Sequence, residues 1–239
     1  MATVRIMSGG APKEIFLQLT PQFERQSGNK VDYVFAVMSA LRDKLAAGEK
    51  ADVLVMPTNI LDGYQKDKVV RAQGRAVLGL VSVNAVVRTG AAKPDLSTPE
   101  KVKQAMLQSR AITHATPGAT PSGTHMGKLV EQLGIADAMK GKIIHRAALE
   151  GGVQLVASGE AEIGFYPKSE VVNTDGLTVV GPLPAAIQLT TIYGAAVTAV
   201  SPAPDAAAAF IKFMSDPAHR KAWAHAGFDP PVQSRIEPN

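Results

Sequence analysis

Strands and helices alternate through the first third of the chain, and this alternation constrains the fold more than any other feature. Strand patterns at 3–8, 31–36 and 52–56 are each followed by a helical pattern. The strand at 52–56 is apolar at nearly every position, which is typical of a strand covered on both faces. Alternation of this kind predicts a mainly parallel sheet with helices on its faces. The helices are expected at 11–27, 38–47 and 58–66.

Two further strand patterns lie far apart in the sequence. The run 77–88 is longer than the usual strand of about 5–6 residues, and 190–200 is rich in β-branched and small residues. We expect the first to carry the chain into a second lobe and the other to return it. The predicted fold is α/β, with two Rossmann-like lobes of mainly parallel sheet joined by a two-strand hinge. Residues 1–80 and 190–239 would form lobe I and residues 81–189 lobe II, with the ligand cleft between them.

The remaining patterns fill the second lobe and complete the first. Ser97–Glu100 has the form of a capping box that opens a helix. An amphipathic helix at 205–215 and a last helix at 217–226 are expected near the end of the chain, with Trp223 in the core. The other expected elements are a helix to Gln108, a strand at 111–114, helices to Gly134 and at 135–140, a strand at 143–146, a helix from Gly151 to Ser158 and a strand at 163–166.

The stretch 116–127 joins a strand to a helix through Pro, Gly, Ser and Thr, with no acidic residue. Thr120 or Ser122 can cap the helix, and Gly123 lets a ligand approach the backbone closely. Free N–H groups and the positive end of the helix dipole make such a helix start a site for anions. Taken alone, the stretch is better explained as an ordinary strand-to-helix loop with good capping.

The pattern recurs at three other helix starts, namely 8–11, 38–41 and 150–153. Ligands of open α/β sheets bind outside the carboxyl ends of the strands. If the four helix starts converge, they form a cleft for a small anion. The ligand-binding residues expected there are Ser8, Gly9, Gly10, Ala11, Met38, Ser39, Thr120, Ser122, Gly123, Thr124, Gly151 and Gly152.

Composition and motif spacing argue against several other functions. Aromatic residues are 5% of the chain and the basic residues are scattered at a net charge of +4, so a nucleic-acid partner is not expected. The chain has no cysteine, and its histidines lack the spacing of zinc ligands. Neither dinucleotide nor P-loop spacing follows Gly9-Gly10. We therefore expect no cofactor and no metal.

Several motifs in order resemble one family over nearly the whole chain. They are Ser39–Leu41 followed by 45–53, then Pro121–Thr124, then Ala157–Gly164, then 206–215 leading to Gly227-Phe228. They resemble the periplasmic substrate-binding proteins of ABC transporters of the molybdate-binding type, which have the type 2 two-lobe fold. This resemblance implies an oxyanion held by serine hydroxyls, main-chain N–H groups and a tyrosine hydroxyl. It assigns ligand contacts to 8–11, Ser39, Ser122, 149–152 and Tyr166. The wider resemblance includes bacterial aconitate isomerases.

Two classes of function follow from these observations. The first is a monomeric solute-binding protein that captures a small anion, an oxyanion or a polycarboxylate, for an ABC permease. We expect it in the periplasm after removal of an export signal, with a cytoplasmic location as the alternative. The second is an isomerase of a small unsaturated tricarboxylate such as aconitate. It would need a proton carrier, for which His125, Tyr166 and Glu150 are the candidates.

Overall fold

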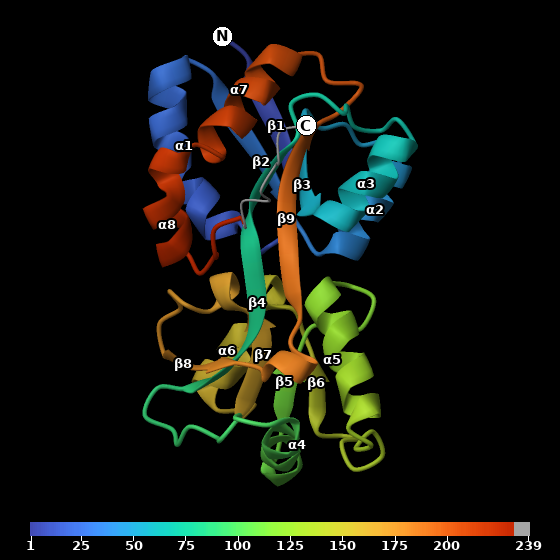
Figure 1. Ribbon diagram of the computed structural model, residues 1–239, viewed down its shortest axis with the longest axis vertical. Helices are drawn as coiled ribbons and strands as arrows, with labels where there is room; N and C mark the ends of the chain where they lie inside the picture. The colour runs from blue at the N-terminus through green and yellow to red at the C-terminus, as the bar shows by residue number, and fades with distance from the viewer. Residues whose placement is uncertain (232–239) are drawn as a thin grey trace, which may run out of the picture.

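The computed structural model describes residues 1–231. Its strands form one hydrogen-bonded sheet in the order β2-β1-β3-β9-β4-β7-β5-β6, with β8 also paired to β4. Figure 1 shows two lobes stacked along the long axis, with β4 and β9 running between them. We call the lobe with β1–β3, α1–α3, α7 and α8 lobe I, and the lobe with β5–β8 and α4–α6 lobe II.

Lobe I follows the predicted alternation of strand and helix. Its three strands are parallel, with β1 between β2 and β3, and the strand β3 is fully buried. The helices α7 and α8 come from the end of the chain and pack beside α1 (Figure 1). In order, the elements are β1 (Thr3–Ser8), α1 (Lys13–Ser27), β2 (Lys30–Phe35), α2 (Met38–Ala46), β3 (Val53–Pro57), α3 (Thr58–Lys66), α7 (Pro204–Met214) and α8 (Arg220–His225).

The two crossing strands are β4 (Ala76–Arg88) and β9 (Thr190–Val197), and they pair with each other antiparallel. β4 pairs with β9 as far as Ser82 and with β7 from Val83 onward. One strand therefore belongs to the sheets of both lobes. The lobe boundaries predicted near residues 80 and 190 stay a prediction, but the change of strand partner falls close to the first of them.

Lobe II is built on the parallel strands β5, β6 and β7, with β5 in the middle. β8 adds to β4 antiparallel, on a path separate from β7. The elements are α4 (Pro99–Gln108), β5 (Ile112–His114), α5 (Pro121–Gln132), β6 (Ile143–His145), η1 (Ala148–Glu150), α6 (Gly152–Ser158), β7 (Ile163–Pro167), η2 (Lys168–Glu170), β8 (Leu177–Pro182) and η3 (Ala185–Ile187), where η marks a 3₁₀ turn.

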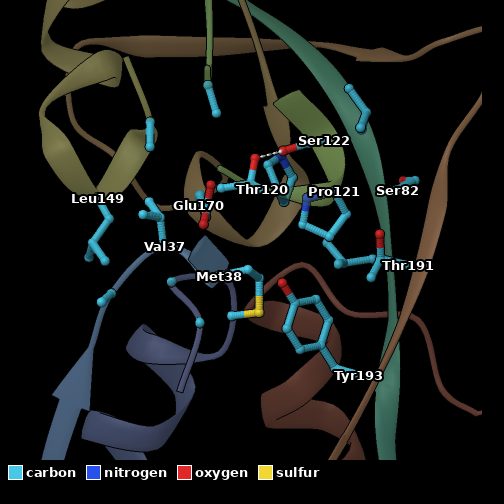
Figure 2. Close-up of a pocket in the computed structure, with 18 residues that line it drawn as sticks. Val37, Met38, Ser82, Thr120, Pro121, Ser122, Leu149, Glu170, Thr191 and Tyr193 are labelled. Carbon is cyan, nitrogen blue, oxygen red and sulfur yellow. Dashed lines mark hydrogen bonds between the residues drawn. The ribbon is translucent and has the colours of Figure 1, made fainter. Parts of the chain in front are cut away.

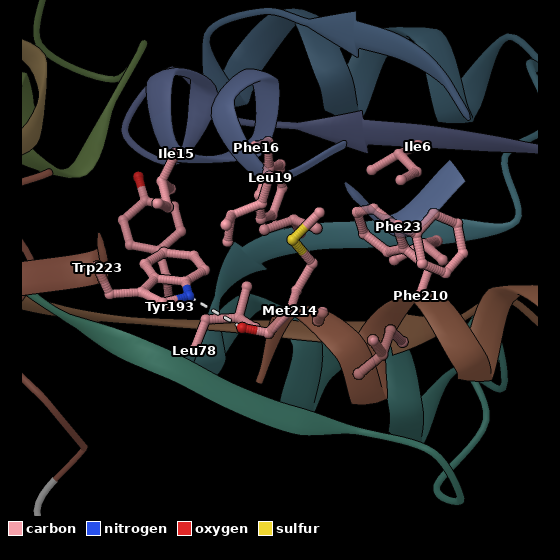
Figure 3. Packing of buried hydrophobic residues seen from close by; sticks show 14 of the residues in the cluster. Ile6, Ile15, Phe16, Leu19, Phe23, Leu78, Tyr193, Phe210, Met214 and Trp223 are labelled. Atoms are coloured by element: carbon pink, nitrogen blue, oxygen red, sulfur yellow. Dashed lines mark hydrogen bonds between the residues drawn. The ribbon is translucent and has the colours of Figure 1, made fainter. Parts of the chain in front are cut away.

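The core of lobe I joins residues from both ends of the chain. Phe16 is fully buried and its ring lies 5.7 Å from that of Phe210 and 5.9 Å from that of Trp223, both edge-on. Trp223 is 5% exposed, and its indole N–H donates to the carbonyl of Met214 at 2.9 Å (Figure 3). The prediction that Trp223 lies in the core with a satisfied N–H is confirmed.

Some elements differ from the prediction for local reasons. Residues 135–140 form turns instead of a helix, because Gly134 and Gly141 at positive φ bound a segment too short to sustain helical hydrogen bonding. The N-cap of α4 is Thr98, whose Oγ1 accepts from the N–H of Lys101. The last helix divides into a 3₁₀ turn, η4 (Pro217–His219), and α8, while β8 was not predicted.

Within residues 1–231, no helix has the length and apolar character that crossing a membrane requires.

Candidate functional site

A cavity that is partly open to solvent lies where the two lobes meet. Three of the four predicted helix starts, those of α1, α2 and α5, contribute to its wall. The fourth, 150–153, does not, although Ala147 and Leu149 from the loop before it do. Figure 2 shows Glu170, Thr120 and Ser122 on one side of the cavity and Met38 and Tyr193 on the other. It is lined by Gly9, Gly10, Ala36, Val37, Met38, Val81, Ser82, Val83, Ala115, Thr120, Pro121, Ser122, Ala147, Leu149, Pro167, Glu170, Thr191 and Tyr193.

The start of α5 brings two hydroxyls to the cavity. Oγ1 of Thr120 caps the helix by accepting from the N–H of Gly123 at 3.0 Å, and it lies 3.1 Å from Oγ of Ser122. Gly123 is required because an added Cβ would lie 2.5 Å from the carbonyl oxygen of Ala115. Thr124 turns back into its own loop, donating to the carbonyl of Thr120 and accepting from Gly118. Of the predicted residues here, Thr120 and Ser122 line the cavity, while Gly123 and Thr124 support the loop.

The lobe I loops contribute mainly backbone to the cavity wall. Gly9 and Gly10 line it, whereas the hydroxyl of Ser8 is fully buried and donates to the carbonyl of Gly9 at 3.0 Å. Ala11 packs into the core of lobe I. Of the predicted stretch 8–11, Gly9 and Gly10 therefore belong to the cavity wall, and Ser8 and Ala11 are buried in lobe I.

The start of α2 touches lobe II directly. Met38 lines the cavity, but Ser39 is not among the lining residues, and its N–H donates to the carbonyl of Ala119 at 3.2 Å. Arg42 reaches the carbonyl of Gly118 at 3.5 Å. The structure therefore places Ser39 at a contact between the lobes, beside the cavity wall.

The crossing strands add polar groups that sequence reasoning missed. Ser82 on β4 and Thr191 and Tyr193 on β9 all line the cavity. Thr191 and Tyr193 are two residues apart, so they point to the same face of the strand. That spacing in the middle of a long strand was the available signal. Burial raises the pKa of the Tyr193 phenol, so it remains a hydrogen-bond donor around neutral pH.

Glu170 was also missed, and among the described residues it is the one acidic residue that lines this cavity. It ends the 3₁₀ turn η2 after β7, and a Cβ added at Gly10 would lie 2.6 Å from its Oε1. The carboxyl of lobe II thus lies against the Gly9–Gly10 loop of lobe I. Burial raises the pKa of Glu170 to about 7. Within residues 1–231, its carboxylate oxygens take part in no hydrogen bond or ion pair; its backbone carbonyl accepts from Thr174.

A second, more open cavity adjoins the first and shares Gly10, Leu149 and Glu170 with it. Gly151 lines this one, together with Lys13 and Glu14. Gly152 lines neither cavity, and a Cβ added there would clash with the hydroxyl of Tyr166. The predicted glycine pair therefore also divides, with Gly151 at the outer cavity and Gly152 packed beneath the site.

The three predicted proton carriers lie outside both cavities. Nε2 of His125 lies 2.9 Å from the carbonyl of Ile187. Tyr166 is fully buried, 2.8 Å from Oγ1 of Thr113, and donates to the carbonyl of Arg146 at 3.0 Å. Glu150 is exposed and accepts from the N–H of Ala147 at 3.4 Å. Tyr166 and Glu150 thus hold the loop before α6, which forms part of the cavity wall.

Metal binding has no geometric support in the described part of the chain. Residues 1–231 contain no group of three or more His, Asp or Glu side chains placed to hold a metal ion.

Comparison with known proteins places these features in a family. The chain is 28% identical to aconitate isomerase of Pseudomonas sp over 238 residues, 96% of this chain and 88% of that protein. It is 25% identical to the molybdate-binding protein ModA of Escherichia coli K12 over 169 residues, 70% and 65% of the two chains. The fold matches the periplasmic molybdate-binding protein of Azotobacter vinelandii with a TM-score of 0.80 at 18% identity, covering 96% of this chain and all of that one. Residues 4–229 match the family of bacterial extracellular solute-binding proteins, and because this match spans nearly all the described residues, the chain belongs to that family.

Proposed function

We propose that the protein captures a small anion, an oxyanion or a polycarboxylate, in the cavity between its lobes. The observation that carries this proposal is the set of hydroxyls that converge there from β4, β9 and the start of α5: Ser82, Thr120, Ser122, Thr191 and Tyr193. Neutral donors bind an anion well when they are held in place in advance, because the surrounding wall excludes competing water. The N-terminus of α5, a helix of 12 residues, adds the positive end of its dipole.

The role that fits such capture is delivery to a transporter. The family consists of extracellular solute-binding proteins, and the relatives named above include molybdate-binding proteins. We infer that this chain acts as a monomer in the periplasm and hands its anion to an ABC permease. Lobes I and II, which contact each other through Ser39 and Ala119, would present the closed form to that permease.

Thermal stability tests the proposed ligand class directly. Anion binding to the folded state raises the free energy of unfolding, by roughly 2.7 kcal/mol at a ligand concentration 100-fold above Kd. Molybdate, tungstate, sulfate, phosphate, citrate and the two aconitate isomers are each added, and Tm is followed by calorimetry. At least one of them should raise Tm. A rise only with sugars or cations would contradict the proposal.

Ser122→Ala should weaken anion binding by about 1.5–3 kcal/mol, the usual contribution of a hydrogen bond to a charged group. Ser122 is 6% exposed and its Oγ faces the cavity beside Thr120. Ser39→Ala is the matched control, because that side chain lies outside the wall and its N–H, which is retained, makes the contact between lobes. Titration calorimetry gives both affinities. Equal losses in the two variants would place the ligand elsewhere.

A second candidate function is isomerisation of aconitate, favoured by the 28% identity to an aconitate isomerase over 96% of this chain. In that reaction a base takes a proton from the methylene carbon, the double bond moves by one position, and the proton returns to the former vinyl carbon. Glu170, the carboxyl in the cavity wall, would be the base, with the hydroxyls holding the substrate carboxylates. Incubation with trans-aconitate in deuterium oxide, followed by NMR, tests it. Appearance of cis-aconitate supports the isomerase, and an unchanged spectrum over hours leaves the binding function.

A further inference from the structure

The carboxylate of Glu170 would repel the anion that the neighbouring hydroxyl groups are suited to bind. Its carboxyl forms part of the same wall as Thr120, Ser122 and Tyr193. No lysine, arginine or histidine is among the described residues that line this cavity. A bound anion would therefore lie near a carboxylate without a cation to compensate, and two like charges in a partly buried site cannot both remain ionised.

The charged and titratable groups around Glu170 do not compensate the repulsion between its carboxylate and a bound anion. Lys168 belongs to the same 3₁₀ turn and forms no ion pair with Glu170 in the described residues. Asp175, which lines the outer cavity, is itself acidic and cannot compensate the charge of Glu170. Lys13 and Glu14 of α1 line the outer cavity, and Lys13 likewise makes no ion pair with Glu170 in the described residues.

Two tyrosines also face the carboxyl. The charge of Glu170 adds to the burial that raises the pKa of both Tyr166 and Tyr193. Both phenols therefore stay protonated around neutral pH. Glu170 is then the group in this cluster that changes charge there.

We propose that Glu170 carries a proton whenever an anion occupies the cavity, so that anion capture takes up one proton from solution. The proposal rests on the anion-binding function given above. Protonated, the carboxyl is a further donor to the anion; ionised, it repels it. The raised pKa of Glu170, about 7, fits this role, because it makes the proton available near neutral pH before any ligand arrives. Capture would then be favoured in mildly acidic surroundings and release in alkaline ones.

The first experiment measures proton uptake. Sulfate, molybdate and trans-aconitate, which are all fully ionised at about pH 8, are titrated in buffers of different ionisation enthalpy. Binding to the wild type should take up about one proton at about pH 8, and its affinity should fall about tenfold for each further pH unit, the slope for one linked proton. Glu170→Gln should bind without uptake and without this slope. Glu14→Gln, which removes a carboxyl from the outer cavity, is the matched control and should behave as the wild type does.

The second experiment needs no ligand and so separates this proposal from the proposed function. With a folded-state pKa raised from 4.5 to about 7, Glu170 contributes stability at low pH that is lost as the pH rises through 7. The Tm of the wild type should therefore fall relative to that of Glu170→Gln between about pH 5 and pH 8. If the Tm difference between the wild type and Glu170→Gln does not change with pH, the proposal is overturned. It is also overturned if the wild type binds an anion without taking up a proton. Anion binding without proton uptake, together with turnover of aconitate, would assign Glu170 as an ionised base. If no anion binds but the Tm difference changes as stated, the anion function fails while the proton on Glu170 stands.

Discussion

Ser122→Asp is expected to weaken anion binding by at least about 3 kcal/mol, more than 100-fold, because like charges brought together at a binding interface cost several kcal/mol. The new carboxylate would project from the start of α5 into a cavity whose described wall holds no compensating cation. The fold should tolerate the change, since acidic residues are favourable in the first turn of a helix. The affinity is measured by titration calorimetry at about pH 8 with the anion that gives the largest thermal shift.

Ser122→Asn is the control for this variant, because it has the same size without the charge. It should lose much less affinity than Ser122→Asp, and the gap between the two should narrow as salt is added. Equal affinities for the Asp and Asn variants would show that the cavity ligand carries no negative charge. A loss confined to a variant that has also lost Tm would instead reflect damage to α5.

Phe16→Ala should lower the free energy of unfolding by about 3–5 kcal/mol, the usual cost of truncating a buried aromatic side chain. Phe16 is fully buried and contacts the rings of Tyr33, Phe210 and Trp223, so its removal leaves a cavity among three other aromatic residues. Leu17→Ala is the matched control on the same helix, because Leu17 is 46% exposed, and it should change stability by less than about 1 kcal/mol. Urea unfolding followed by Trp223 fluorescence measures both. Equal losses would contradict the assignment of the α1 core face.

The sequence predicts backbone features well where they depend on neighbouring residues. Capping by Thr120 and the strand–helix alternation of lobe I both follow from local chemistry, and both appear in the structure. The convergence of the helix starts of α1, α2 and α5 on one cavity follows from these, because parallel strands carry their helix starts at one edge of the sheet. The second lobe was predicted in the same way from the long strand patterns at 77–88 and 190–200, and the family resemblance agreed with it.

Side-chain direction was the harder part, because it depends on contacts made far along the chain. Ser39 and Ser122 both lie in the first turn of a helix, yet only Ser122 lines the cavity, while the backbone N–H of Ser39 donates to the carbonyl of Ala119. Glu170 follows a strand without any motif, and only the packing of η2 against Gly10 brings it to the wall. Thr191 had a period-2 signal, but the position at which β9 crosses between the lobes cannot be derived from its own sequence.

The continuous strand β4 and the distant origin of α7 set the order in which the protein can assemble. The segments of lobe II follow one another along the chain, whereas the aromatic core of lobe I needs Phe16 from one end and Phe210 and Trp223 from the other. During synthesis, the first three strands would emerge long before β9, the partner of β3, has been made. We therefore expect the lobe that begins the chain to finish folding last. Until then its apolar surface is open to chaperones and to aggregation.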